Sequence, residues 1–298
     1  MIQEEAAILP RIEGEIGGEN WTEVIGPKRH LFRLNLGEVW RYRDLIILFV
    51  KRDLASQYRQ TVLGTLWFLI QPVMTMLMFL TVFNKIAKIP TDGLPPSLFY
   101  LSSITIWNYF SSCLTSTSNT FVSNAGIFGK VYFPRLVSPL SAIISNLIKF
   151  LIQLSLVAIL IACYYFNGFF SPPAGWHFFL LPVIVFFTAL MGLGIGIICS
   201  SLTTKYRDLS ILIGFAVGLL MYVTPVAYPL SYLQESGYAA FIRWNPLTPM
   251  VEGFRYAIFG EGVFDPLFFL YSVSCAMVFL LVGILLFNKV ERSFMDTV

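Results

Sequence analysis

The chain has 298 residues, of which 56% are hydrophobic and 12% are charged, and its formal net charge is +3. Soluble domains carry about 25% charged residues, so this composition and the mean hydropathy of +0.72 exclude an ordinary soluble protein and predict an integral membrane protein. The four cysteines lie in apolar runs without the spacing of metal ligands, which predicts buried apolar side chains rather than a metal site or disulfides.

Residues 1–36 precede the first apolar segment and are rich in glutamate, glycine and proline. They lack the basic-then-apolar pattern of a signal peptide. We expect a loosely ordered cytoplasmic tail there, and a second short cytoplasmic tail at residues 291–298.

Residues 37–62 are predicted to form an amphipathic helix at the membrane surface. One helical face combines Leu36, Trp40, Ile47, Val50 and Leu54, and charged residues occupy the opposite face. Such a helix is a simple anchor, or its basic side chains also contact an anionic lipid head group. The basic residues of this segment are Arg41, Arg43, Lys51, Arg52 and Arg59.

Six apolar stretches approach the length of about 20 residues that a membrane-spanning helix needs. Within a predicted transmembrane domain of residues 63–290, they are 64–84, 98–121, 138–166, 177–200, 209–229 and 266–288. In this topology fifteen of the twenty Lys and Arg lie on the side of both termini and four lie on the other. Because cytoplasmic loops are enriched in Lys and Arg, we expect both termini in the cytoplasm.

The first span contains Gln71 followed by Pro72. Proline removes one helical hydrogen bond, so this pair predicts a bend in a pore-lining helix, with a local packing accommodation as the alternative.

Polar residues also interrupt the second and third spans. The third carries Ser141, Ser145, Lys149 and Gln153 at intervals of four, which places them on one helical stripe. Small hydroxylated residues often serve helix packing. A lysine at this depth normally faces a bundle interior or a watery cavity, although a snorkelling or structural role is the alternative.

Residues 230–258 are too apolar for a free loop and too interrupted by proline to span. They predict short re-entrant or interfacial helices on the outer side, where protein rather than lipid covers the backbone.

No catalytic centre can be assembled from these residues. Asp and Glu lie outside the six spans or at their edges, which argues against a carrier driven by an ion gradient. "GIFGK" at 126–130 lacks the spacing of a nucleotide-binding loop, and the only histidines, His30 and His177, fall on opposite sides of the membrane. We expect no catalytic residue, cofactor or metal in this chain, and any transport would need a partner that hydrolyses the nucleotide.

Five segments resemble a known family. They are "RDLASQYRQTVLGTLWFLIQP" (52–72), "IFGKVYFPR" (127–135), "TTKYRDL" (203–209), "TPVAYP" (224–229) and "NPLTPMVEGFRYAIFG" (245–260). Over residues 36–292 the chain resembles the membrane subunit of type 2 ABC exporters, most closely the polysaccharide exporters and, among them, the O-antigen permeases of the Wzm type.

The resemblance implies an all-α fold of six transmembrane helices, an interface helix and outer gate helices. It implies a homodimer in the bacterial inner membrane, joined to two copies of a Wzt-like cytoplasmic ABC ATPase that binds ATP and Mg. The substrate would be a glycan linked through diphosphate to undecaprenol, and no nucleic acid is involved.

The resemblance and the chemistry of the side chains together nominate four sets of site residues. Contact with the ATPase is expected from Lys130, Tyr132, Phe133, Arg135, Tyr206 and Arg207. Contact with the lipid diphosphate is expected from Arg41, Lys51, Arg52 and Arg59. Channel-lining candidates are Gln71, Tyr109, Ser111, Thr115, Lys149, Tyr222 and Tyr228. The outer gate is expected to include Tyr232, Trp244 and Arg255.

Other functions remain open at this point. The same architecture serves exporters of capsular polysaccharide, teichoic acid or small molecules. A membrane-embedded glycan-modifying enzyme and a passive scaffold for envelope assembly are alternatives outside transport.

Overall fold

The computed structural model describes most of the chain after its first 35 residues. The described residues are 36–58, 61–128, 130–131, 133–170, 175–203, 206, 208–233, 237 and 239–295. They belong to one compact unit, residues 34–298. The tail expected at residues 1–36 lies, apart from Leu36, outside the described residues, and so do residues 296–298.

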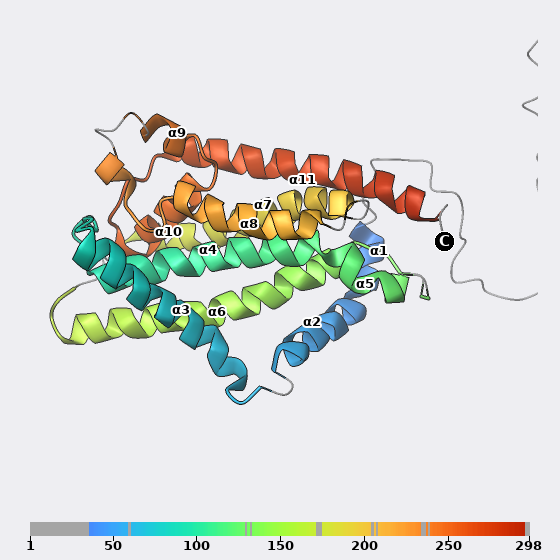
Figure 1. Cartoon of the computed structure of the whole chain (residues 1–298), viewed down its shortest axis with the longest axis horizontal. Coiled ribbons are helices and arrows are strands. Elements are labelled where there is room, and N and C mark those ends of the chain that lie inside the picture. The colour runs from blue at the N-terminus through green and yellow to red at the C-terminus, as the bar shows by residue number, and fades with distance from the viewer. Residues whose placement is uncertain are drawn as a thin grey trace, which may run out of the picture. The chain divides into compact units, whose positions relative to one another are not determined.

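All regular secondary structure in the described part of the chain is helical, and no β-strand occurs there (Figure 1). The first half comprises α1 (Leu36–Arg41), α2 (Arg43–Tyr58), α3 (Trp67–Phe79), α4 (Pro96–Ser118), α5 (Thr120–Phe128) and α6 (Val137–Phe166). The second half comprises α7 (Leu180–Thr203), α8 (Leu209–Val223), α9 (Ala239–Arg243), α10 (Thr248–Phe259) and α11 (Pro266–Met295). Short 3₁₀ turns at Gly64–Leu66, Trp176–Phe179 and Leu230–Leu233 precede α3, α7 and α9.

Four helical segments are long and apolar enough to cross a membrane. They are Gly64–Ile86, Val137–Phe166, Trp176–Thr203 and Pro266–Phe287, and each falls on one of the six predicted spans. α4 has 23 residues, but its Ser, Thr and Asn side chains lower its hydropathy. α8 is apolar but has only 15 residues. Length and composition therefore support an integral membrane protein with at least these four candidate spans.

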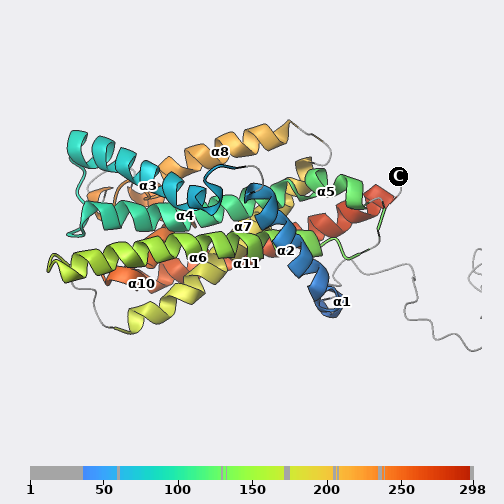
Figure 2. The same ribbon diagram turned by 90° about the horizontal axis from the view of Figure 1, so that it is seen from below.

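α4 is the central helix of the unit. It packs against α7 and α6 through large interfaces and against α3 and α10 through smaller ones. In Figure 2 it lies between α8 and α6, and its residues from Leu98 to Trp107 are all buried. The core of the described chain therefore forms around this helix.

Glycines allow α7 to approach its neighbours closely. A Cβ on Gly194 would lie 2.6 Å from the backbone nitrogen of Leu280, and a Cβ on Gly283 would lie 2.8 Å from the carbonyl oxygen of Gly194. Gly192 and Gly196 meet α4 in the same way, on another side of α7. Small residues therefore set the distance between these helices, as they do in many membrane bundles.

The predicted amphipathic segment forms two helices, α1 and α2, and its apolar face is divided. Val39 and Phe49 are buried in a cluster with Phe133 and Val137, whereas Ile47 and Leu48 are exposed. Of the face that the sequence assigned to the membrane, Val50 is buried, whereas Trp40 and Ile47 are exposed. Contact of this segment with the membrane surface stays a prediction.

Pro72 lies buried within α3, which continues into a π-helical segment at Leu80–Ile86. The Thr75 hydroxyl donates to the carbonyl oxygen of Gln71 at 3.0 Å, while the Gln71 side chain is exposed. The predicted bend and its place in a pore stay predictions.

The predicted outer segment folds as the turn Leu230–Leu233, α9 and α10. α10 is almost entirely buried and contacts α4, α7 and α11. Protein therefore covers its backbone, and its role as a gate stays a prediction.

Candidate functional site

A polar cavity of about 370 Å³ lies among α2, α4, α5 and α6. Its lining consists of hydroxyl, amide and charged groups with a single alanine. The lining residues are Arg52, Asp53, Ser56, Thr115, Ser116, Asn119, Thr120, Ser123, Asn124, Ser138, Ala142, Ser145, Asn146 and Lys149. In an otherwise apolar chain, this concentration of hydrogen-bonding groups marks the cavity as a candidate binding site.

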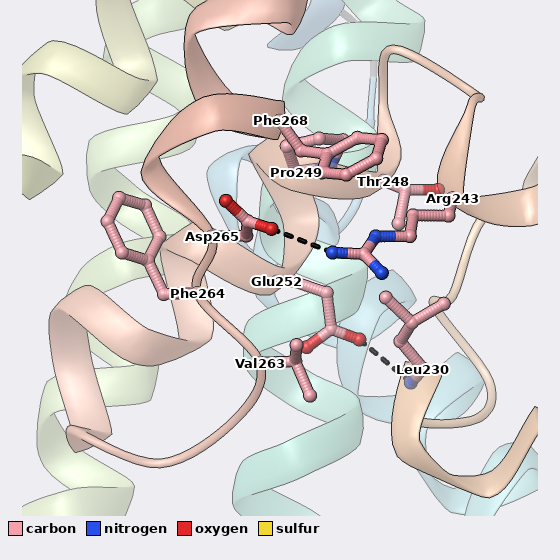
Figure 3. Close-up of a pocket in the computed structure, with 9 residues that line it drawn as sticks. All are labelled: Leu230, Arg243, Thr248, Pro249, Glu252, Val263, Phe264, Asp265 and Phe268. Carbon is pink, nitrogen blue, oxygen red and sulfur yellow. Dashed lines mark hydrogen bonds and ion pairs between the residues drawn. The ribbon is translucent and has the colours of Figure 1, made fainter. Parts of the chain in front are cut away.

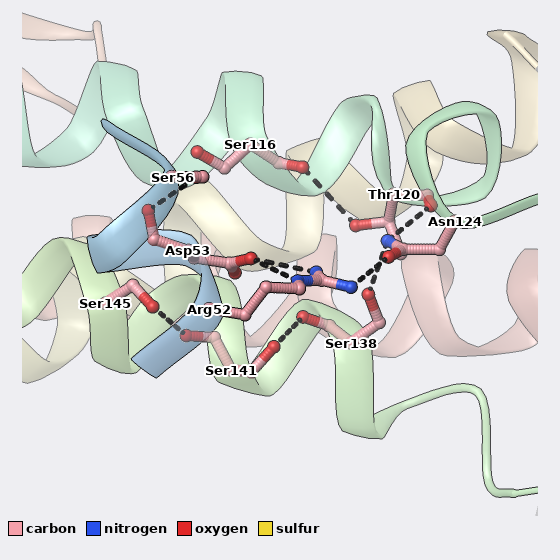
Figure 4. A network of polar contacts seen from close by, with 9 residues as sticks. All are labelled: Arg52, Asp53, Ser56, Ser116, Thr120, Asn124, Ser138, Ser141 and Ser145. Atoms are coloured by element: carbon pink, nitrogen blue, oxygen red, sulfur yellow. Dashed lines mark hydrogen bonds and ion pairs between the residues drawn. The ribbon is translucent and has the colours of Figure 1, made fainter. Parts of the chain in front are cut away.

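Arg52 connects three helices at one end of the cavity (Figure 4). Its Nε and Nη2 atoms donate to Asp53 Oδ1 at 2.9 and 2.8 Å, and its Nη1 donates to Asn124 Oδ1 at 3.2 Å. Asn124 in turn donates to Ser138 Oγ at 2.8 Å and to the carbonyl oxygen of Thr120 at 3.0 Å. The network ties α2 to α5 and α6.

Several hydroxyls of the lining donate to their own helices. Thr115 bonds the carbonyl of Ser111 at 2.8 Å, and Ser145 bonds that of Ser141 at 2.9 Å. This back-bonding is usual for Ser and Thr in helices and leaves the hydroxyl oxygen able to accept a further hydrogen bond.

Lys149 also lines the cavity, and Asn146 is its hydrogen-bond partner. The Lys149 ammonium donates to Asn146 Oδ1 at 3.1 Å and lies 5.7 Å from the ring centroid of Phe68. Asn146 donates to Ser116 Oγ at 3.2 Å, which joins α6 to α4. The predicted stripe of α6 thus faces this cavity through Ser145 and Lys149.

Asp53, Asn124 and Asn146 were not singled out from the sequence. The contact of Asn146 with Lys149 could have been predicted from the sequence, because residues three apart on a helix lie on the same face. Asn124 had no such signal, since its partners Arg52 and Ser138 come from other helices.

Phe133 is the buried member of the predicted ATPase contact. Its ring lies 5.7 Å from that of Phe49 and 5.5 Å from that of Phe128, and it is 5% exposed. The Arg135 guanidinium lies 5.8 Å from the Phe128 ring. These contacts fix the start of α6 against α2 and α5.

Other members of that set lie at the surface or outside the described residues. Lys130 and Tyr206 are exposed. Tyr132 and Arg207 lie outside the described residues.

The predicted head-group residues divide similarly. Arg41 and Lys51 are exposed, and Arg52 is the cavity residue described above. Arg59 lies outside the described residues.

The channel-lining candidates fall into three environments. Tyr109 is buried, with its ring 4.8 Å from that of Phe150, and therefore lies in the core. Ser111 is half-buried, and Thr115 lines the polar cavity together with Lys149.

The remaining channel candidates lie on α3 and near the end of α8. Gln71 and Tyr222 are exposed, Tyr222 by 56%. Tyr228 is half-buried, and its hydroxyl donates to the Tyr222 carbonyl oxygen at 2.9 Å.

Arg255, predicted for the outer gate, is 1% exposed and forms a buried ion pair with Glu252. Its Nη1 donates to Ser103 Oγ and to the carbonyl oxygen of Pro225, both at 3.0 Å. Its guanidinium carbon lies 4.3 Å from the Phe99 ring centroid. Arg255 thus fastens α10 to α4. Glu252 was missed, although its spacing of three from an arginine on a helix signals such a pair.

A second, small cavity of about 20 Å³ lies beside Glu252 (Figure 3). Glu252 Oε1 accepts from the Leu230 backbone at 2.9 Å, while Oε2 is buried without a hydrogen-bond partner in the described part of the chain. On the far side, Arg243 bonds Asp265 at 2.7 Å and lies 4.2 Å from the Phe268 ring centroid. The volume suffices for about one water molecule.

The other gate candidates are exposed. Tyr232 is 52% exposed and Trp244 is 60% exposed. The Trp244 ring lies 5.4 Å from that of Tyr271, whose hydroxyl donates to the Trp244 carbonyl oxygen at 3.1 Å.

The described groups of the polar cavity can donate and accept hydrogen bonds. No three His, Cys, Asp or Glu side chains among the described residues are grouped to hold a metal ion. The His177 ring packs 5.0 Å from that of Trp176 and 4.8 Å from that of Tyr256. His177 therefore lies within an aromatic cluster.

Comparison with protein families matches residues 44–259 to the ABC-2 type transporter family. The matched range begins in α2 and ends with α10, so it contains the polar cavity and the Glu252–Arg255 pair.

Individual relatives are similar over most of the chain. An O-antigen export system permease protein RfbA of Klebsiella pneumoniae is 27% identical over 264 residues, which cover 89% of this chain and 97% of the relative. One from Myxococcus xanthus is 29% identical over 244 residues, or 80% and 90% of the two chains. A polysialic acid transport protein KpsM of Escherichia coli is 22% identical over 247 residues, or 83% and 93%.

Proposed function

Because the chain belongs to the ABC-2 type transporter family, we propose that it is the transmembrane subunit of an ATP-driven exporter of O-antigen polysaccharide. The observation that carries this proposal is its similarity, over most of its length, to permeases named for O-antigen export. The polar cavity among apolar helices supports it, because a carrier of hydroxylated polymers needs hydrogen-bonding groups inside the membrane domain.

Energy would come from two copies of a Wzt-like ABC ATPase with bound ATP and Mg, attached to a homodimer of this chain. The ATPase would bind the cytoplasmic surface around Lys130 and Tyr206, which are exposed. Phe133 would pass the ATPase motion to α2 and α6, since its ring contacts Phe49. Tyr132 and Arg207 complete the proposed contact.

The proposed topology has six spans with both termini in the cytoplasm of a bacterial cell, in the inner membrane. α4 would be the second span. Its hydroxyls support this role, because buried Ser102, Ser103 and Thr105 donate to carbonyls of their own helix and so have hydrogen-bond partners away from water. α8 would be the fifth span. Its 15 residues extend about 22 Å, so the chain after it must complete the crossing.

The substrate would be a glycan on undecaprenyl diphosphate, which meets the cytoplasmic rim at Arg41, Lys51, Arg52 and Arg59. Exposed Gln71 and Tyr222 are the better-supported channel residues, whereas buried Tyr109 supports the fold. Tyr232 and Trp244 would face the outer exit, and Arg255 would hold the proposed gate helix α10 in place.

Capsular polysaccharide is the second candidate substrate. The similarity to a polysialic acid transport protein favours it, at lower identity. Teichoic acid and small-molecule export share the architecture, and we give them no observation of their own.

Transport into inverted inner-membrane vesicles tests the proposal. Such vesicles expose the cytoplasmic face, so ATP added outside should drive lipid-linked O-antigen into the lumen, where it resists oxidation by external periodate. We expect protection only when the chain, its ATPase and hydrolysable ATP are all present. Protection that is the same without the chain would contradict the proposed function.

A further inference from the structure

We propose that the polar cavity among α2, α4, α5 and α6 binds the phosphate of a hydroxylated head group, with Lys149 as its main cation. This site goes beyond the proposed function, because it does not depend on which polymer the exporter carries. The charge, the hydrogen-bonding groups and the position of the cavity support this site.

The lining carries two cations, Arg52 and Lys149, and one carboxylate, Asp53, which bonds Arg52 and acts on Lys149 through its electric field without a hydrogen bond to it. Arg52 and Asp53 are joined by two hydrogen bonds and neutralise each other. Lys149 bonds only the neutral amide of Asn146 among the described residues. The lining therefore carries a net charge of about +1 in a site that protein partly encloses. An ammonium in such a site is stabilised by an anionic oxygen ligand.

The cavity also offers enough donors for an oxyanion. An ammonium has three N–H groups, and Lys149 uses one of them for Asn146. The amide of Asn119 and the hydroxyls of Ser116 and Ser123 line the same space. Phosphate oxygens accept several charge-assisted hydrogen bonds at once, which matches this supply.

The remaining lining favours a ligand that has hydroxyl groups beside its phosphate. The oxygens of Thr115, Thr120 and Ser145 are available as acceptors, because these hydroxyls donate to their own helices. A bare phosphate has few hydrogens to offer them, whereas a glycerol or sugar hydroxyl donates. A volume of about 370 Å³ lies within the range of small-molecule sites, roughly 300–1,000 Å³.

The position of α2 favours access from a membrane surface. On α2, Ile47 and Leu48 are exposed beside the basic residues Arg43 and Lys51, and Trp40 on the preceding helix α1 is 71% exposed. Exposed apolar and basic side chains on one helix are typical of segments at the depth of lipid head groups. The cavity behind α2 would then lie within reach of a phosphate at that depth.

Binding of inorganic pyrophosphate to the full chain, purified in detergent without an ATPase, tests the site by calorimetry. Lys149→Met should weaken binding about tenfold or more, since a hydrogen bond to a charged group contributes roughly 1.5–3 kcal/mol. Lys149→Arg should retain most of the affinity, because it keeps the charge. Lys85→Met is the matched control, because Lys85 is exposed outside the cavity, and it should leave binding unchanged.

Asp53→Asn provides a test in the opposite direction. It removes the carboxylate that neutralises Arg52, so pyrophosphate should bind more tightly. This variant keeps the test decisive even if Lys149→Met folds poorly, which size-exclusion chromatography would show.

Two lipid conditions distinguish the source of the phosphate. Nanodiscs of phosphatidylcholine alone are compared with nanodiscs that also contain phosphatidylglycerol, and the thermal stability of the chain is measured. Stabilisation by phosphatidylglycerol that Lys149→Met abolishes assigns the site to a membrane lipid. Pyrophosphate binding without that stabilisation assigns it to a free or substrate-borne diphosphate. If neither probe shows a response that depends on Lys149, the cavity holds only water and the inference is wrong.

Failure of vesicle transport alone would overturn the proposed polymer and leave this site intact.

Discussion

The ring of Phe133 meets the ring of Phe49 edge to face, with centroids 5.7 Å apart and ring planes at 85°. Both side chains are 5% exposed, and each comes from a segment that the sequence assigned to the cytoplasmic side. The contact joins α2 to the chain just before α6. A movement imposed on the proposed ATPase contact would therefore reach α2 directly.

Phe133→Ala should loosen this contact and destabilise the chain by about 3 kcal/mol, because it leaves a cavity between aromatic rings. If the segment also contacts the ATPase, co-purification of the ATPase should fall as well. Thermal unfolding in detergent and quantitative pull-down measure the two effects. Phe133→Leu should retain most of both, and Phe241→Ala, at an exposed position, should change neither. An unaltered pull-down with Phe133→Ala would remove the coupling role.

The buried pair of Glu252 and Arg255 should respond strongly to removal of one partner. Arg255→Met leaves the Glu252 carboxylate buried without a counter-ion, at a cost of about 3–5 kcal/mol. The double variant with Glu252→Gln should recover much of that loss, because no charge then remains buried. Thermal unfolding in detergent measures each variant.

Arg243→Met is the matched control for that experiment. Arg243 pairs with Asp265 at the surface, so its loss should cost no more than about 1 kcal/mol. Equal destabilisation by Arg243→Met and Arg255→Met would contradict the structural role given to the buried pair.

The close approach of α7 and α11 predicts a contrast between two glycines. Gly194→Ala places a methyl group 2.6 Å from the Leu280 nitrogen, so the helices must separate, and a loss of about 1–3 kcal/mol is expected. Gly214→Ala on α8 meets nothing within 4 Å and should be neutral or slightly stabilising, because alanine favours helix. Melting temperatures that fall equally for both variants would show that the α7–α11 contact is not as close as described.

The environment of Asp265 predicts how the stability of the chain changes at acid pH. The backbone N–H of Leu267 donates to its carboxylate at 3.0 Å and Arg243 pairs with it, and together they hold the pKa of Asp265 below its usual 3.8. A lowered pKa means that this carboxylate contributes stability above pH 3.8, and that the contribution is lost as the pH falls through the lowered value. The melting temperature of Asp265→Asn should therefore lie below that of the unaltered chain at neutral pH, with the difference shrinking below pH 3.8. A difference in melting temperature that grows on acidification would contradict this role of Asp265.

The proposed orientation predicts which residues an impermeant maleimide reaches from outside. In a chain without its four native cysteines, Glu261→Cys should be labelled in intact spheroplasts, whereas Lys130→Cys should be labelled only after lysis. Both positions are exposed, so accessibility within the chain does not separate them. The reverse pattern would invert the topology.

Composition and hydropathy were enough to predict the helical membrane class, and four of the six predicted spans reappear as long apolar helices. α4 shows the limit of that signal. Most of its residues are buried, yet its hydroxyl-bearing residues make it less apolar than α8, which is mostly exposed. The burial of α4 depends on which helices surround it, and the hydropathy of its own residues does not predict those neighbours.

The site was predictable where one helix carries it. The spacing of Ser145 and Lys149 on α6 was visible in the sequence, and both line the polar cavity. The contacts of Arg52 with Asn124, and of Arg255 with Ser103, join residues 72 and 152 positions apart. Such pairings depend on the tertiary packing of the helices, so no local sequence pattern predicts them.

Depletion of the chain in its native cell, followed by chemical analysis of glycan on both sides of the inner membrane, tests the central claim most directly. The account predicts that finished, lipid-linked O-antigen accumulates on the cytoplasmic face while surface O-antigen disappears. Normal surface glycan without any cytoplasmic accumulation would contradict polysaccharide export by this chain.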